Sequence, residues 1–149
     1  MSTYSKTIGN KLNDLLEKTY DAEKGFEKAA EKTKNTYLKG FFERKAKERY
    51  NFGHELKAEI KSFGQEVDKG NSLASKAHRT WMDLKAMFAS DNEEAMLEEA
   101  IRGEKAAVEE YEEVINQSVL PPSTELLLKK QRNAIEVGFN NIKTLEDIR

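Results

Sequence analysis

Apolar residues recur at steps of three and four along most of the chain, a pattern typical of amphipathic helices with one buried face. The first such stretch predicts a helix over residues 5–33. A polar break follows at Lys34, Asn35 and Thr36, where Asn35 or Thr36 can cap a second helix that ends near Gly64. The residues that define the two stripes include Ile8, Leu12, Leu15, Leu16, Phe26, Leu38, Phe42, Phe52, Leu56 and Ile60.

The second half of the chain repeats the pattern after a loop at residues 65–72. A shorter helix is predicted over residues 73–88, and Ser90 with Glu93 fits a capping box that starts a third long helix. Pro121 and Pro122 end that helix and start a fourth, whose stripe extends to Leu145. The pattern therefore predicts four long helices with one shorter helix between the second and the third.

The lengths of the connections predict how these helices pack. Short links join the first helix to the second and the third to the fourth, so each pair forms an antiparallel hairpin. The longer connection between the hairpins contains the shorter helix, which is long enough to carry the chain most of the way along a bundle. We therefore expect a single all-α domain over residues 1–149, a ferritin-like four-helix bundle with an extra helix in the crossover. A simple five-helix up-and-down arrangement is the alternative.

Composition excludes several classes of protein. The 25 basic and 27 acidic residues nearly balance, whereas a general nucleic-acid binder carries a basic surplus. The chain has no cysteine, which excludes thiolate zinc sites, iron–sulfur clusters and a cysteine nucleophile. No apolar stretch approaches the length of a membrane-spanning helix, and the start lacks the apolar core of a secretory signal. We expect a cytoplasmic protein that binds neither nucleic acid nor membrane.

Three charged residues fall on the apolar stripes: Glu23, Arg49 and Glu104. In the crossover topology they lie about 15, 20 and 18 Å from the same end of the bundle, and thus in one layer. Burying an isolated charge costs several kcal/mol, so the three are expected to pair. Such a cluster fixes helix register or builds a metal or proton-transfer site. The guanidinium favours the structural interpretation, because it neutralises the carboxylates that would attract a cation.

The sequence argues against an ordinary di-iron centre. Such centres use the motif Glu-x-x-His twice, and neither His54 nor His78 has a glutamate three residues before it. The second helix offers Lys45, Arg49 and Phe52 at inward positions, and the fourth offers Gln131, Ile135 and Gly138. We expect no metal. The alternative is a site for iron or manganese with Glu23, Glu104 and His78 as ligands.

A polar and aromatic group on the predicted crossover helix is the second candidate site. His78, Arg79 and Trp81 lie close together, and His78 and Trp81 share a helix face. One interpretation is a ligand-binding or proton-transfer residue held over the bundle. We favour the other, in which Trp81 anchors the crossover while His78 bonds a backbone or carboxylate partner.

Three short motifs stand out in the chain: Asp21 to Phe26, the His78-Arg79-Thr80-Trp81 group and the Arg102-Gly103-Glu104 triplet. They resemble an uncharacterised bacterial family, a domain of unknown function with a four-helix bundle, placed in the ferritin-like superfamily, and the resemblance covers about residues 4–148. It implies the bundle fold and no established activity. Where relatives carry His-Asp, this chain has Asn140-Asn141, which weakens a metal site on the fourth helix. Gly103 permits close helix approach, and Arg102 is placed to pair with an acidic neighbour.

The function expected from these observations is that of a ferritin-like bundle without an ordinary di-iron centre. It self-associates as a homodimer, and the family analogy suggests a role in stress physiology. One alternative is a metal-binding oxidoreductase or metal-storage protein that uses core carboxylates. Another is a helical adaptor that binds an unknown protein partner through the surface around Trp81.

Overall fold

The computed structural model describes residues 3–67, 93–117, 119–140, 142 and 144–148. Within these residues the chain forms helices and no strand, which confirms the all-α class for this part of the protein. The helices are α1 (Thr3–Lys32), α2 (Thr36–Ser62), α5 (Glu93–Gln117) and α6 (Pro122–Asn140), followed by the short 3-10 helix η1 (Leu145–Ile148). The helix predicted at 73–88 and its neighbour Ser90 lie outside the described residues.

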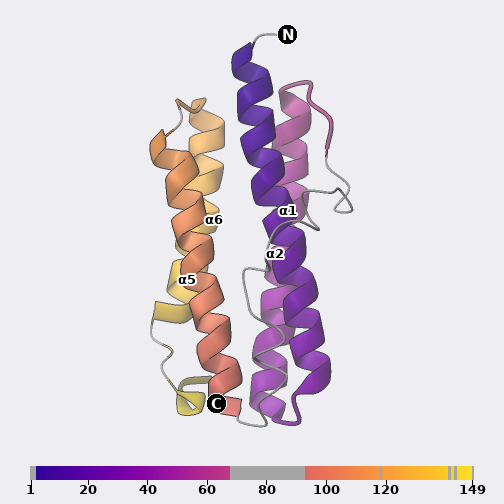
Figure 1. Cartoon of the computed structure of the whole chain (residues 1–149), viewed down its shortest axis with the longest axis vertical. Coiled ribbons are helices and arrows are strands. Elements are labelled where there is room, and N and C mark those ends of the chain that lie inside the picture. The colour runs from indigo at the N-terminus through magenta and orange to yellow at the C-terminus, as the bar shows by residue number, and fades with distance from the viewer. Residues whose placement is uncertain (1–2, 68–92, 118, 141, 143, 149) are drawn as a thin grey trace.

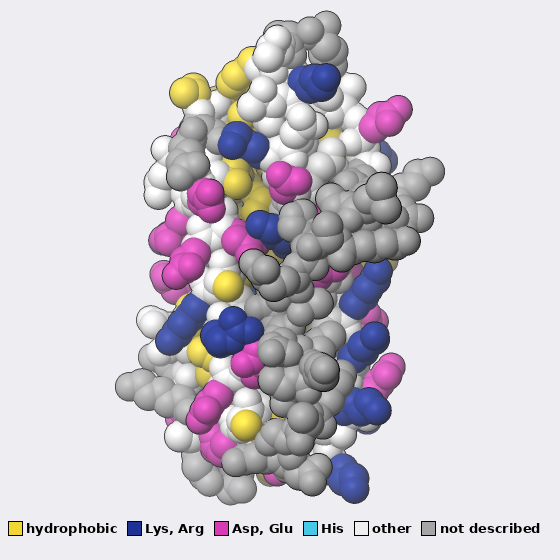
Figure 2. Space-filling model, in the orientation of Figure 1, with side chains coloured by type: hydrophobic (Ala, Val, Ile, Leu, Met, Phe, Trp, Pro, Cys, Tyr) yellow, Lys and Arg dark blue, Asp and Glu magenta, His cyan; other side chains and the backbone are white. Residues whose placement is uncertain are grey.

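The four long helices form two antiparallel hairpins that lie side by side (Figure 1). Helix α1 packs along α2, and α5 packs along α6. Helices α2 and α5 run in the same direction, so the end of α2 and the start of α5 lie at opposite ends of the molecule. Figure 2 shows acidic side chains gathered over the α5–α6 hairpin and basic side chains along the outer edge of the other hairpin.

Local hydrogen bonds explain the ends of α2. Asn35 is the N-cap, since its side-chain oxygen accepts from the backbone N–H of Leu38 at 2.9 Å. At the other end Phe63 is the C-cap, and Gly64 follows with φ of 70° while its N–H donates to Lys61 O. That left-handed backbone favours glycine, so Gly64 ends the helix close to the predicted position.

The fourth long helix is shorter than its apolar pattern predicts. The stripe continues to Leu145, but α6 ends at Asn140 and Leu145 belongs to η1. The backbone N–H of Thr144 donates to the Asp147 carboxylate at 2.9 Å, and Asp147 N donates to Thr144 O. These reciprocal bonds start a new turn, and asparagine is a poor helix former, so the helix stops despite apolar residues beyond it.

A polar layer divides the apolar core into two clusters. On α2 the first cluster extends to Ala46 and the second begins at Phe52. On α5 the corresponding residues are Ala100 and Val108. The buried side chains at the level between the two clusters include charged groups from both hairpins, and these form the candidate site. Among the described residues, no helix is both long enough and apolar enough to cross a membrane.

Candidate functional site

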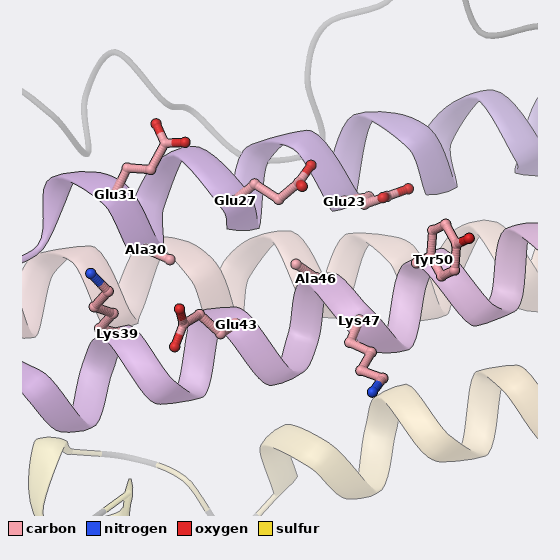
Figure 3. A pocket seen from close by; sticks show the side chains of 9 residues that line it. All are labelled: Glu23, Glu27, Ala30, Glu31, Lys39, Glu43, Ala46, Lys47 and Tyr50. Carbon is pink, nitrogen blue, oxygen red and sulfur yellow. The ribbon is translucent and has the colours of Figure 1, made fainter.

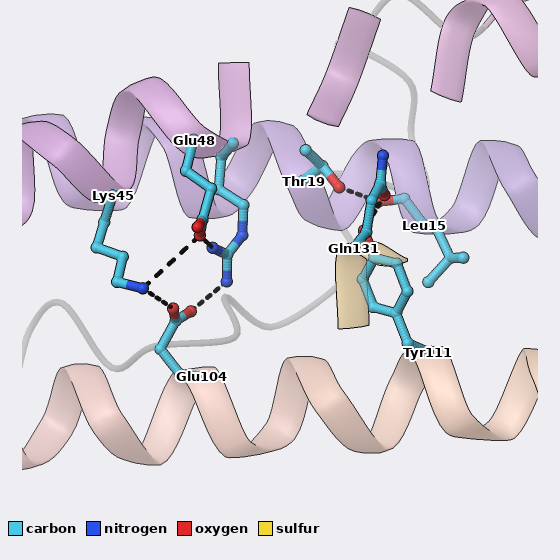
Figure 4. Close-up of polar contacts among 8 residues, drawn as sticks. Leu15, Thr19, Lys45, Glu48, Glu104, Tyr111 and Gln131 are labelled. Atoms are coloured by element: carbon cyan, nitrogen blue, oxygen red, sulfur yellow. Dashed lines mark hydrogen bonds and ion pairs between the residues drawn. The ribbon is translucent and has the colours of Figure 1, made fainter. Parts of the chain in front are cut away.

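Arg49 of α2 and Glu104 of α5 form a buried ion pair between the two hairpins (Figure 4). Arg49 is 2% exposed and Glu104 is fully buried. The Nη2 group of Arg49 donates to Glu104 Oε1, and Nη1 donates to Glu48 Oε1 at 2.6 Å. The guanidinium thus bridges a carboxylate on its own helix and one on the facing hairpin, as its forked donors allow.

Lys45, one helical turn before Arg49, brings a second buried cation to the same carboxylates. Its ammonium lies 3.6 Å from Glu104 Oε2 and 3.7 Å from Glu48 Oε1. The side chain is 9% exposed. Two cations and two anions therefore meet in one layer, and their formal charges cancel. Charged groups can be buried when positive and negative charges balance, because each ion loses its water but retains a counter-ion.

Aromatic rings and one glycine shape the space around the cations. The Arg49 guanidinium lies 5.7 Å from the ring centre of Phe26 and 5.9 Å from that of Phe52. On α6, a Cβ added to Gly138 would overlap the Lys45 ammonium. Gly138 therefore leaves the room that the lysine needs to reach Glu104.

Burial dominates the electrostatics of Glu104. Loss of hydration raises the pKa of its carboxyl above the ordinary value of 4.5, while Arg49 and Lys45 act in the opposite direction. Its Oε2 atom is buried and has no hydrogen bond, and the nearby Lys45 ammonium is beyond hydrogen-bond distance. Glu104 is therefore paired through Oε1 and only loosely compensated at Oε2.

A second buried group of hydrogen bonds joins α5, α6 and α2, further along α5 than Glu104. The hydroxyl of Tyr111 donates to Gln131 Oε1 at 2.6 Å. The amide nitrogen of Gln131 donates to Phe52 O at 3.3 Å and to Glu55 Oε1 at 3.0 Å. Burial raises the pKa of Tyr111 well above its ordinary value of 10, so this hydroxyl is held as a proton donor.

The structure separates Glu23 from the other two members of the predicted triad. Glu23 is only partly buried, and it lines an open groove of about 550 Å³ between α1 and α2 with Glu27, Lys47 and Tyr50 (Figure 3). Partial burial and the neighbouring Glu27 raise the pKa of Glu23. At the level of Arg49 and Glu104, Lys45 and Glu48 complete the charged cluster in its place.

Helical geometry explains the position of Glu23. Its spacing of seven residues from Leu16 and from Ala30, which are both buried, places it on the apolar stripe but not in the middle of the buried face. Thr19, Ala22 and Phe26, which are all buried, follow the tighter spacing of three and four. Glu23 is therefore at the edge of the buried face, beside the groove.

The remaining motif residues occupy separate places. Arg102 is exposed and pairs with Glu99 one turn earlier on α5, while Gly103 is buried beside Glu104. Asp21 is partly buried on α1. The predicted crossover group of His78, Arg79 and Trp81 lies outside the described residues.

The donor set around Glu104 does not suit a metal ion. Among residues 3–67 and 93 onward that the structure describes, no three histidine, aspartate or glutamate side chains gather as a possible metal site. The groups nearest to the Glu104 carboxylate are a guanidinium and an ammonium, which have no lone pair to offer a cation. Glu23, the other carboxylate of the alternative site, lines the α1–α2 groove.

Lys45 and Gln131 are buried, as the sequence predicts for inward positions, but their partners in the two networks do not follow from the sequence pattern. Lys45 lies three residues after Phe42 and four before Arg49, and Gln131 lies three after Leu128 and four before Ile135. The same rule that identified Arg49 places both on their stripes. Glu48 carries no such signal, because it neighbours Arg49 in sequence and reaches the cluster from the side.

Comparison with known proteins assigns the chain to a family. Residues 7–117 match the family model described as Domain of unknown function (DUF2383), and the chain belongs to that family. The match includes the whole Lys45, Glu48, Arg49 and Glu104 cluster and ends before α6. No curated protein sequence matches the chain.

Proposed function

We propose that this member of the DUF2383 family is a ferritin-like bundle in which a neutral ion cluster takes the place of a di-metal centre, and that it works by association rather than by metal-dependent oxidation. The arrangement of two antiparallel hairpins, with α2 and α5 running in the same direction, supports the ferritin-like topology. The resemblance noted in the sequence supplies the stress-related setting that we propose for it.

The observation that carries the proposal is the set of partners around Glu104. In di-metal bundles, inward carboxylates from several helices converge on cations. Here Arg49 and Lys45 supply the positive charge from side chains. On α6, the inward positions hold Gln131, which is bonded to Tyr111, and Gly138, which faces Lys45. The alternative of a metal-binding oxidoreductase requires Glu104 to exchange these partners for a metal ion.

Metal content separates the two alternatives. Protein purified without chelator is dialysed against manganese or ferrous iron under anaerobic conditions, and the bound metal is counted by mass spectrometry. We expect much less than one equivalent, with no difference between wild type and Glu104→Gln. A full equivalent that disappears in Glu104→Gln would overturn the proposal. Glu125→Gln is the matched control, because Glu125 pairs with Lys129 near the surface of α6 and belongs to neither alternative.

We further propose that the association is with a second copy of the chain, through the outer face of α6. Leu126 and Val137 are 71% and 74% exposed, and they lie three turns apart on one side of the helix. Each of these side chains would lose its exposed apolar surface if a partner covered this face. Light scattering tests this proposal: wild type should be a dimer, and Leu126→Glu with Val137→Glu should be a monomer of equal helicity. A monomeric wild type would refute it.

A further inference from the structure

An open pocket of about 440 Å³ adjoins the ion cluster on the side of α6. Lys45, Glu48 and Gly138 of the cluster region line it, and Phe41, Ile142 and Ile148 supply apolar walls. Its size falls within the range of small-molecule sites, although its lining is more polar than is usual for them, because four charged side chains share it with the apolar ones. The pocket is distinct from the α1–α2 groove that contains Glu23.

The Lys45 ammonium lines this pocket, and its ion-pair partners lie beyond hydrogen-bond distance. Its side chain is nine-tenths buried, yet its two ion-pair distances are 3.6 and 3.7 Å. Both exceed the roughly 2.7–3.2 Å of an N–H···O hydrogen bond. An ammonium has three N–H donors, so Lys45 keeps the capacity to donate to an oxygen in the open pocket. A ligand oxygen there would take the place of water at these donors.

The other polar groups indicate the charge of such a ligand. The two acids of the pocket are already engaged, because Glu48 accepts from Arg49 at 2.6 Å and Asp147 accepts from Thr144 N at 2.9 Å. Arg44, whose side chain is exposed, adds a second cation to the lining. Lys45 and Arg44 therefore supply donors to the pocket, which suit a ligand that carries an acceptor. The two carboxylates disfavour a dianion such as phosphate, so a single negative charge fits best.

We propose that this pocket binds a small monocarboxylate with an apolar body. One carboxylate oxygen accepts from Lys45 Nζ, and Arg44 contributes the second positive charge at the rim. The apolar body lies against Phe41, Ile142 and Ile148. Gly138 has a defined part in this site, since a side chain there would overlap the ammonium and displace it from the pocket. The inference does not depend on the metal question, because it requires only the position of Lys45.

Titration with benzoate, followed by two-dimensional NMR of the amide groups in the full chain, tests the proposal. We expect saturable shifts at about millimolar concentration, centred on residues 41–48 and 138–148. Benzyl alcohol, which has the same ring without the charge, should bind at least about tenfold more weakly. Shifts centred elsewhere, equal binding of the alcohol, or no saturation by about 20 mM benzoate would overturn the proposal.

Substitutions of single basic residues test which side chain binds the carboxylate. Lys45→Met should abolish the benzoate shifts, and Arg44→Gln should weaken binding about threefold to tenfold. Arg44 is exposed, so its substitution reports on the site even if Lys45→Met fails to fold. Lys47→Gln is the control, because Lys47 is an exposed lysine of the same helix that lines the other groove. Equal affinity of Arg44→Gln and Lys47→Gln would contradict the assignment.

Discussion

Arg49 and Glu104, 55 residues apart in sequence, meet in the core with 2% and 0% of their surfaces exposed, and their ion pair joins the two helical hairpins. The contacts within each hairpin are far more extensive than those between the hairpins. The pair therefore fixes the height at which one hairpin packs on the other, since sliding either hairpin by one turn would leave two buried charges unpaired.

Removing one member of this pair should be strongly destabilising. Arg49→Met leaves the Glu104 carboxylate buried with only the more distant Lys45, and we expect a loss of about 3–5 kcal/mol in the free energy of unfolding, measured with urea. The control is Arg102→Gln, which breaks an exposed pair with Glu99 and should cost less than about 1 kcal/mol.

The double variant tests whether the loss comes from the unpaired charge. Arg49→Met combined with Glu104→Gln removes both ions and should recover more than half of the stability lost in Arg49→Met alone. If the two substitutions simply add, the two residues are not coupled, and the proposed role of the pair in hairpin register is wrong.

The raised pKa of Glu104 predicts a specific dependence of stability on pH. Its carboxyl binds a proton more tightly in the folded than in the unfolded protein. Its contribution to stability should therefore fall as the pH rises from about 4.5 through the raised pKa, and then level off. Urea unfolding of wild type and of Glu104→Gln, which cannot titrate, gives this contribution as a difference at each pH. If wild type instead gains stability relative to Glu104→Gln as the pH rises over this window, the attraction of Arg49 and Lys45 for the carboxylate outweighs the effect of burial on its pKa.

Two helical glycines offer a matched test of the space around Lys45. Alanine at Gly40 would meet only the end of the exposed Arg44 side chain, so Gly40→Ala should raise the unfolding free energy by roughly 0.5–1 kcal/mol through helix propensity. Gly138→Ala should show no such gain, because its Cβ would overlap the Lys45 ammonium and displace it from Glu104. Equal stabilisation by both substitutions, in thermal or urea unfolding, would mean that the ammonium moves at no cost.

The hydrogen bond of Tyr111 should also be measurable as stability. Tyr111→Phe leaves Gln131 Oε1 buried without its 2.6 Å donor, and we expect a loss of about 1–3 kcal/mol. Tyr50→Phe, in which the ring is about half exposed, should change stability by less than about 0.5 kcal/mol. Similar effects of the two substitutions in urea unfolding would show that the buried network contributes little.

The spacing of apolar residues predicts much of this architecture. The bounds of α1 and α2, the Asn35 cap and the proline start of α6 all follow from local rules that depend on neighbours in sequence. The same spacing places Arg49 and Glu104 inward at a common level. The end of α6 does not follow from it, because the Thr144–Asp147 turn competes with an apolar pattern that continues past Asn140.

The composition of the cluster is harder to derive. Whether Glu23 or Lys45 completes it depends on which side of each helix faces the other hairpin and on how closely two helices approach. Glu23 is at the margin of its stripe, and a small rotation directs it to the groove. The Lys45 ammonium lies where a Cβ on Gly138 would be, on a helix more than 90 residues later in sequence, so its position depends on that residue being glycine. This contact depends on how α2 and α6 pack against each other, and the spacing of residues within either helix does not specify it.

The most direct test of the central claim is a crystal structure from crystals grown with manganese chloride, with anomalous scattering recorded to locate the metal. The account predicts that the guanidinium of Arg49 lies against Glu104, with no anomalous peak at the carboxylate. A manganese peak coordinated by Glu104, with Arg49 turned away from the core, would contradict it.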